Sequence, residues 1–275
     1  MYIDFHLHAF ADKIAEKAIG ELQKHLREVG LDDTAYSDGT YGDTLSQFEK
    51  NEICGVLMPI ATKPSQMKVC NDWAAEKNDR KRFWSYGSVY PKTESKEELD
   101  TVLAELERIK ALGLYGIKFH PDYQTFYPDD ESIFPIYEKC AELSLPIMFH
   151  AGFDPISPNL THATPDRLLR VIETFPGLTA IFAHMGGEDH WDEVEELLCG
   201  KNCYIDTSYC AENMESSQME RMIKKHGSKH VLFGSDFPWK DPVVIMNKIR
   251  SLNLSEDEKD NIFYKNALEL LETDS

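Results

Sequence analysis

Short apolar runs alternate with amphipathic stretches along the chain, beginning with residues 2–10, YIDFHLHAF. Successive side chains of a β-strand face opposite sides. A strand here would therefore place Asp4, His6 and His8 on one face and the apolar residues between them on the other. The polar face must meet water, a ligand or a metal, because buried polar groups need partners. A half-exposed strand with ordinary surface histidines is the alternative.

Seven later apolar runs also predict strands. They cover residues 53–60, 82–90, 114–120, 145–150, 178–184, 203–209 and 230–236. Several are apolar almost throughout, which is typical of strands buried on both faces of a parallel sheet.

Between the strands, apolar residues recur at helical spacing. The clearest predicted helices cover residues 11–30, 95–112, 133–143, 164–175 and 191–199. Gly30 suits the end of the first of them, and Thr164 followed by Pro165 suits the start of another.

Eight strands alternating with helices in one chain of 275 residues predict an α/β fold, the (β/α)8 TIM barrel, as a single domain over residues 1–275. A doubly wound open sheet is the second choice, but no glycine-rich phosphate loop follows the first strand. Long connections at 121–132 and 151–164 are expected to form lids or binding loops. Residues 31–43 are expected to be a further cover or a surface connection.

Composition narrows the choice of partners. The net charge of −19 disfavours nucleic acid and anionic membrane surfaces, so a small-molecule substrate is expected. No apolar run approaches the ~20 residues of a membrane span, and the N-terminus lacks the order of a secretory signal. The six cysteines show no disulfide framework, and the spacing of Cys199, Cys203 and Cys210 matches no zinc motif. These features predict buried or free thiols and a cytoplasmic location.

Histidine and aspartate recur where the predicted strands end. The residues are His6, His8, His120, His150, His184 and Asp236. In a parallel barrel these ends meet at one mouth, where barrel enzymes place catalytic groups. Crowded imidazoles and a carboxylate indicate a divalent metal, with Zn first and Mn, Fe or Co as alternatives. Such a metal can activate water near neutral pH, with Asp236 or His184 accepting the proton.

Several motifs occur here in a characteristic order. They are DFHLH at strand one, GIKFHP at four, FHAG at five, AHMGG at six, GSDFPW at eight and the terminal NIFYKNALELL. In this order the sequence resembles the amidohydrolase superfamily, specifically the amidohydrolase-related branch that includes aminocarboxymuconate-semialdehyde decarboxylase. The resemblance covers essentially the whole chain.

The resemblance implies roles for individual residues. One metal ion would be held by His6, His8, His150 and Asp236. His184 would orient or deprotonate the metal-bound water, and Asp236 could also shuttle the proton. Binuclear members bridge two metals through a carboxylated lysine or a glutamate at strand four. Here Lys118 and His120 are instead expected to face the substrate, with a lysine paired to a carboxylate such as Asp206 as the alternative for Lys118.

Two chemistries suit the same metal. The first choice is a metal-dependent hydrolase that uses metal-activated water on a small amide, lactone or ester. The alternative is a metal-dependent nonoxidative decarboxylase of an aromatic or unsaturated carboxylic acid. Such an enzyme needs a cation for the carboxylate, and the candidates are Lys63, Lys118, Arg167 and Lys240. A metal-binding module without turnover is the third reading.

The loops leaving the mouth are expected to supply the pocket wall. Its predicted residues are Phe126, Phe153, His162 and Trp239. Each could instead serve only to pack its loop. A homodimer is compatible with such a barrel, but nothing in the sequence specifies it.

Overall fold

A computed structural model describes residues 1–28, 30, 34–155 and 157–272. All eight predicted strands are present, each shorter than its apolar run. They are β1 (Tyr2–Leu7), β2 (Ile53–Leu57), β3 (Phe83–Ser85), β4 (Ile117–Phe119), β5 (Ile147–Phe149), β6 (Ala180–Phe182), β7 (Tyr204–Asp206) and β8 (Val231–Leu232). The runs extend past the strands because their last residues enter the loops that carry the polar side chains.

The eight strands are parallel and follow chain order around a ring. β1, β2 and β3 pair in one sheet, and β4 to β8 pair in a second. Isolated parallel bridges join the two sheets at both seams, Gly87 to Ile117 and Leu7 to Phe237. The predicted α/β barrel is therefore confirmed.

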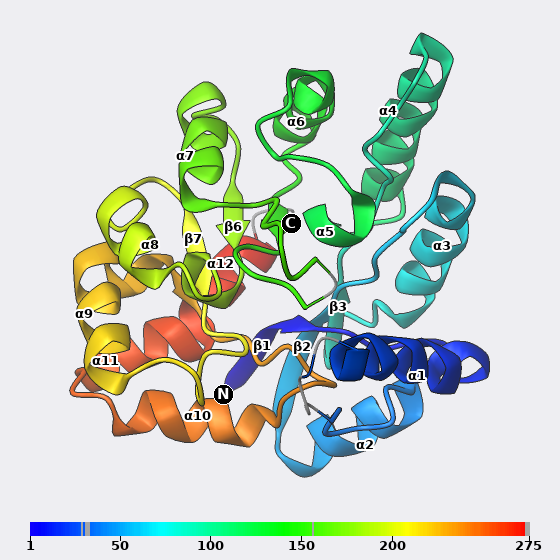
Figure 1. Cartoon of the computed structure of the whole chain (residues 1–275). Coiled ribbons are helices and arrows are strands. Elements are labelled where there is room, and N and C mark those ends of the chain that lie inside the picture. The colour runs from blue at the N-terminus through cyan, green and yellow to red at the C-terminus, as the bar shows by residue number, and fades with distance from the viewer. Residues whose placement is uncertain (29, 31–33, 156, 273–275) are drawn as a thin grey trace.

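Helices surround the strands on all sides (Figure 1). They are α1 (Asp12–Glu28), α2 (Tyr41–Lys50), α3 (Met67–Lys77), α4 (Lys96–Ala111), α5 (Pro121–Gln124), α6 (Phe134–Glu142), α7 (Pro165–Thr174), α8 (Trp191–Leu197), α9 (Ser216–His226), α10 (Pro242–Ser251), α11 (Glu256–Asp260) and α12 (Asn266–Glu272). The five clearest predicted helices correspond to α1, α4, α6, α7 and α8. Thr164 has the extended backbone of an N-cap, although its side chain does not cap the helix.

Two predicted connections contain regular structure. The short helix α5 opens the connection at 121–132 because Pro121 favours a helix start and the His120 side chain accepts from the Tyr123 N–H. In the segment 31–43, residues 31–33 lie outside the described part of the chain, and α2 begins at Tyr41.

The core has two parts. The larger part lies between strands and helices, and the smaller one fills the barrel interior with residues such as Phe5, Met148 and Ile181. Ala267 and Leu271 of α12 join the smaller part. The C-terminal helix therefore packs against the barrel interior.

The predicted alternation along β1 is wrong after Asp4. The register runs from Asp4 opposite Gly55 to Leu7 opposite Leu57, so β1 contains one extra residue. Leu7 accordingly packs in the helix-side core, whereas Ile3 and Phe5 pack in the barrel interior. Such a bulge redirects the following side chains, and it separates Asp4 from the two histidines.

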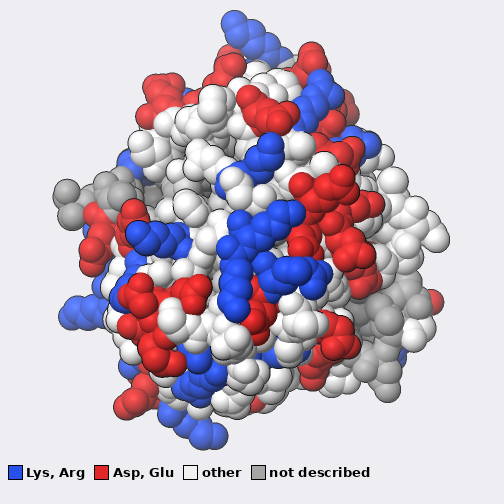
Figure 2. Space-filling view, turned by 90° about the vertical axis from the view of Figure 1, so that its left-hand side faces the viewer, with Lys and Arg blue, Asp and Glu red and all other residues white. Residues whose placement is uncertain are grey.

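The surface mixes charges of both signs. Figure 2 shows a group of Lys and Arg side chains flanked by Asp and Glu on the face that carries α8 and α9. An ion pair between these helices joins Arg221 and Glu195, with Nε 2.7 Å from Oε1. On this face the net negative charge is thus not gathered in a single acidic patch. Within the described residues, no helix combines the length and the apolar character needed to cross a membrane.

The cysteines form no disulfide, as predicted. All six are free thiols, and Cys140, Cys199, Cys203 and Cys210 are buried. Burial raises the pKa of Cys199 to about 11 and of Cys203 to about 12. These thiols therefore stay protonated at neutral pH, as expected for packing residues.

Candidate active site

Polar side chains gather at the carboxyl ends of the strands. They are His6 and His8 in and after β1, Lys118 in β4, His120 after β4, His150 after β5, His184 after β6, Asp206 in β7 and Asp236 after β8. His184 and Asp236 have φ angles of 59° and 64°. Residues other than glycine rarely adopt this region, and such strain concentrates at functional sites.

Three donor atoms converge in what we call the first donor group: His6, His8 and Asp236. The Nε2 atoms of His6 and His8 lie 3.3 Å apart. Asp236 Oδ1 lies 3.5 Å from the Nε2 atom of His6 and 3.3 Å from the Nε2 atom of His8. Ligands at about 2.1 Å from a tetrahedral ion are about 3.4 Å apart. The group therefore fits a divalent metal without rearrangement.

The other ring nitrogen of each histidine is held by an acceptor. Nδ1 of His6 lies 2.8 Å from Asp206 Oδ2, and Nδ1 of His8 lies 2.7 Å from the Met58 carbonyl. Since a carbonyl and an ionised carboxylate only accept, both Nδ1 atoms carry the hydrogen. Both Nε2 atoms thus carry a lone pair that is able to bind a metal.

The charge states also suit a metal. Burial and the nearby Lys118 lower the pKa of His6 to about 3, so its ring is neutral. Burial opposes ionisation of Asp236, but its interactions with His8, His6 and His184 outweigh burial and lower the pKa of that carboxyl. Metal ligation requires neutral imidazole and ionised carboxylate, and the first donor group offers both.

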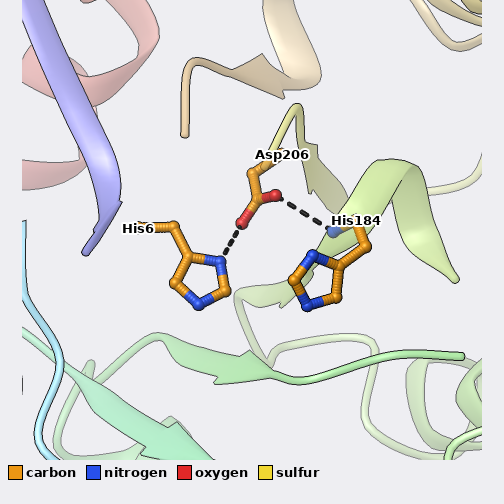
Figure 3. A group of neighbouring side chains, drawn as sticks. All are labelled: His6, His184 and Asp206. Carbon is orange, nitrogen blue, oxygen red and sulfur yellow. Dashed lines mark hydrogen bonds and ion pairs between the residues drawn. The ribbon is translucent and has the colours of Figure 1, made fainter. Parts of the chain in front are cut away.

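His184 is fixed on several sides. Figure 3 shows it across Asp206 from His6, and its backbone N–H donates to Asp206 Oδ1 at 3.0 Å. Its Nδ1 lies 2.9 Å from Ser208 Oγ and 3.2 Å from the Ser208 carbonyl. The Trp191 indole donates to the His184 carbonyl at 3.1 Å. This anchoring orients the Nε2 side of the ring toward the site.

Lys118 lies fully buried beside the first donor group. Its Nζ is 2.9 Å from Nε2 of His6, whereas Asp206 binds that ring from the other side. Burial lowers the pKa of Lys118 to about 8, with the charges of Asp206 and Asp236 opposing the shift. The position is compatible with a lysine that faces the substrate, which stays a prediction.

His150 contacts two other histidines of the site. Its Nδ1 is 3.0 Å from Nε2 of His184, and its ring stacks on that of His120 with centroids 4.1 Å apart. The structure groups it with His120 and Asp154, which we call the second donor group, with donor atoms within 4.8 Å of one another. Among the described residues, three of the four expected ligands thus form one group of donor atoms within 4.8 Å, and ligation by His150 stays a prediction.

Two of the predicted wall residues are held near the site by hydrogen bonds. Nδ1 of His162 lies 2.8 Å from Asp122 Oδ1, and the Trp239 N–H donates to the Asp236 carbonyl at 2.9 Å. Phe153 is partly exposed in the loop after β5. Their contact with a substrate stays a prediction.

Phe126 lies deeper than a wall residue would. It is 3% exposed and belongs to the helix-side core. Its ring meets that of Phe119 edge-on, with centroids 5.5 Å apart. This placement favours the packing alternative for Phe126.

Sequence reasoning missed most of the residues that support the site. From the sequence, Asp206 was considered only as a partner for Lys118, although Asp206 ends an apolar run as the histidines do. Ser208 follows two residues later on the same connection. Asp122 and Asp154 lie in the long loops, where no periodic pattern marks a functional residue.

Comparison with known proteins agrees with this geometry. Residues 3–273 match the profile of a family described as amidohydrolase. A 2-amino-3-carboxymuconate-6-semialdehyde decarboxylase of Dictyostelium discoideum is 27% identical over 228 residues, which cover 70% of this chain and 62% of the relative. The chain thus matches less than two thirds of that relative's length.

Solved structures share the fold over the whole chain. The 5-carboxyvanillate decarboxylase from Sphingomonas paucimobilis superposes with a TM-score of 0.72 at 17% identity, covering 99% of both chains. A dihydroxybenzoic acid decarboxylase from Polaromonas sp. JS666, with bound manganese and the inhibitor 2-nitroresorcinol, gives 0.69 at 17% identity, covering 100% of this chain and 97% of that one. At these identities the likeness establishes the fold alone.

Proposed function

The chain belongs to the amidohydrolase family, and from that premise we propose that it is a metal-dependent nonoxidative decarboxylase of an aromatic or unsaturated carboxylic acid. The first donor group beside His184 is the observation that carries the proposal. The sequence alone favoured hydrolysis. The relatives named above are decarboxylases, and they support the alternative instead.

The resident ion would be held by His6, His8 and Asp236. When bound, it would act as a Lewis acid that polarises an oxygen of the substrate. Imidazole and carboxylate donors suit Zn, Mn, Fe or Co. Manganese in one similar barrel makes Mn as reasonable a choice as the Zn first expected.

The reaction needs one proton and releases carbon dioxide. The bond between the ring or alkene carbon and the carboxylate breaks, CO2 leaves, and the carbon takes a proton in its place. His184 is the proton donor in this proposal, because its ring is anchored at Nδ1 and directs Nε2 into the site. Asp236, a member of the first donor group, is the second candidate for proton transfer.

A carboxylate substrate also needs a positive partner. Arg167 is paired with Asp129 at 2.8 Å and Lys240 with Glu212 at 3.0 Å. Lys118 instead lies inside the site, with its Nζ close to the first donor group. We therefore assign Lys118 to the substrate carboxylate.

Parallel assays separate the three readings. Mn-loaded protein is incubated with hydroxybenzoates and unsaturated dicarboxylates, and separately with lactones, esters and amides, while CO2 and acid release are both measured. His184→Asn should abolish CO2 release, whereas His25→Asn, at an exposed position of α1, should leave it intact. These two results would support the proposal. Acid release without CO2 would favour hydrolysis, and no turnover on either panel would favour a binding module.

A further inference from the structure

Two buried polar atoms without a hydrogen-bond partner face each other beside the site. They are Nε2 of His150 and Oδ2 of Asp122, which lie 3.9 Å apart, and neither has a partner among the described residues. The two side chains are 8% and 0% exposed, so both atoms are shielded from bulk water. Such burial without a partner is unfavourable. The place of the hydrogen on His150 therefore decides whether the two atoms attract or repel each other.

The ring of His150 carries a single hydrogen. Burial, and after it the neighbouring rings of His120 and His184, lower the pKa of His150 well below its usual range, so the ring is neutral. The Ser208 carbonyl only accepts, so Nδ1 of His184 carries a hydrogen and Nε2 of a neutral His184 is an acceptor. This Nε2 lies 3.0 Å from Nδ1 of His150.

The hydrogen of His150 can lie on either nitrogen. On Nδ1 it is donated to His184, and the Nε2 lone pair of His150 then faces the Asp122 carboxylate. On Nε2 it faces that carboxylate, and the Nδ1 lone pair is turned toward His184. The first arrangement sets two buried acceptors against each other. The second sets the lone pairs of two imidazoles against each other, which a nearby cation would relieve.

The second arrangement suits a protein that holds an ion at its first donor group. An imidazole binds a metal through the nitrogen that carries no hydrogen. The His184 ring toward which Nδ1 of His150 points has its centroid 4.8 Å from that of His150 and 5.4 Å from that of His6. Figure 3 shows His184 beside His6. The Nδ1 lone pair of His150 thus faces the side of the site that holds the first donor group.

Asp122 has one oxygen available to the hydrogen of His150. Its Oδ1 accepts from Ser157 Oγ and from Nδ1 of His162, the latter at 2.8 Å. Both donors lie in the loop 151–164, so this loop holds the carboxylate in place. Oδ2 stays open, and a movement of about 1 Å would bring it within hydrogen-bond distance of Nε2 of His150.

A second carboxylate near His150 already faces another donor. Asp154 Oδ2 lies 3.7 Å from Nε2 of His150. Nδ1 of His120 accepts from the Tyr123 N–H at 3.4 Å, so Nε2 of His120 carries the hydrogen and lies 3.3 Å from that same oxygen. Asp154 therefore adds negative charge near Nε2 of His150, whereas Asp122 offers an oxygen that no other donor binds.

We propose that Asp122 is a positioning residue, which accepts a hydrogen bond from Nε2 of His150 and so leaves Nδ1 of His150 as a donor atom for the ion of the first donor group. A supporting carboxylate of this kind fixes the tautomer of a metal-binding imidazole and raises its basicity. Through Ser157 and His162, the loop 151–164 is then linked to the ion. The proposal rests on the ion proposed above and not on the reaction, because tautomers and ion binding are measured without substrate.

NMR of the intact, Zn²⁺-loaded protein, labelled with ¹⁵N at histidine, reads the tautomer directly. In wild type, Nε2 of His150 should carry the hydrogen and Nδ1 should carry none, with the signals assigned by their loss in His150→Asn. Asp122→Asn turns an amide N–H group toward Nε2 of His150, so the hydrogen should move to Nδ1. Competition with a chelator should then show a 10–100-fold loss of Zn²⁺ affinity. Asp100→Asn, the same change at an exposed site on α4, should keep the wild-type affinity.

A hydrogen on Nδ1 of His150 in Zn²⁺-loaded wild-type protein would overturn the proposal. So would an unchanged affinity in Asp122→Asn protein that circular dichroism shows to be folded, or wild-type protein that binds no Zn²⁺. The wild-type spectrum needs no variant at Asp122, so it decides even if that variant fails to fold. The expected tautomer and affinities in a protein that releases no CO2 would support the positioning role and contradict the proposed reaction alone.

Discussion

At the scale of single residues, the site depends on which ring nitrogen of each histidine carries the hydrogen. Asp206, the Met58 carbonyl and the Ser208 carbonyl each hold a Nδ1 atom, of His6, His8 and His184 respectively. None of these three partners belongs to the first donor group. They nevertheless decide that the Nε2 lone pairs of its histidines point inward.

Asp206→Asn tests this supporting role. Asp206 accepts from His6 and from the backbone of His184, and its pKa lies below the usual range because these interactions outweigh burial. Asparagine keeps the shape but loses the charge and one acceptor. Loss of such a support typically costs 10–100-fold in metal affinity. We expect that loss in competition with a chelator, and an unchanged affinity would contradict the role.

His184→Asn tests proton transfer. The variant should retain the ion of the first donor group, because His184 lies outside it, and should lose most of kcat. A proton-transfer group contributes ~10²–10⁴-fold. The measurement pairs steady-state kinetics over pH, in which one limb should disappear, with metal analysis. If the variant released that ion and excess metal restored full activity, His184 would be a ligand.

At the scale of elements, the sequence was sufficient for the order of strands and helices. Apolar runs bounded by polar strand ends predict eight parallel strands, because both faces of each strand are covered. The bulge in β1 could not be predicted, since alternation assumes one residue per step and the extra residue depends on pairing with β2.

The candidate site could likewise be predicted only in part. His6, His8 and Asp236 were found because they end strands that must converge. The orientation of the His150 ring could not be predicted, because it is set by contacts with His184 and His120. Spacing in the sequence carries no information on such contacts.

Helix α9 ends in a buried histidine that allows a prediction of pH dependence. Nδ1 of His226 accepts from the Gly200 N–H at 3.1 Å, and its Nε2 donates to the Cys203 carbonyl at 3.0 Å. Burial lowers its pKa from 6.5 to about 4. Between these values the unfolded chain binds a proton that the native protein does not. Stability is therefore lost as pH falls through this window.

His226→Gln should remove that loss. The histidine accounts for a decrease of roughly 3 kcal/mol in the free energy of unfolding between about pH 6.5 and 4. Urea unfolding at several pH values should give a shallower decline for the variant than for wild type. His25→Gln, at an exposed position, should follow wild type. If the free energy of unfolding declined equally in His226→Gln and in wild type, groups other than His226 would be responsible for the loss of stability at acid pH.

At the scale of the whole molecule, the first donor group spans the seam where the chain closes on itself. At this seam β1 is joined to the segment from β8 onward by backbone hydrogen bonds. The Phe5 N–H donates to Phe233 at 2.7 Å and the His8 N–H to Phe237 at 2.6 Å. His6 and His8 lie on one side of the seam and Asp236 on the other. An ion bound there would link the two ends of the barrel.

Metal removal should therefore destabilise the entire barrel. A ligand that binds only the native state adds about 2.7 kcal/mol at one hundred times its Kd. For a chain of this size, that corresponds to a fall in Tm of roughly 5 °C on chelation. The variant carrying His6→Ala and His8→Ala should begin near the lower Tm and respond little to chelator, whereas Asp100→Asn should respond as wild type does. An unchanged Tm in protein shown to have lost its ion would mean that hydrogen bonds alone close the seam.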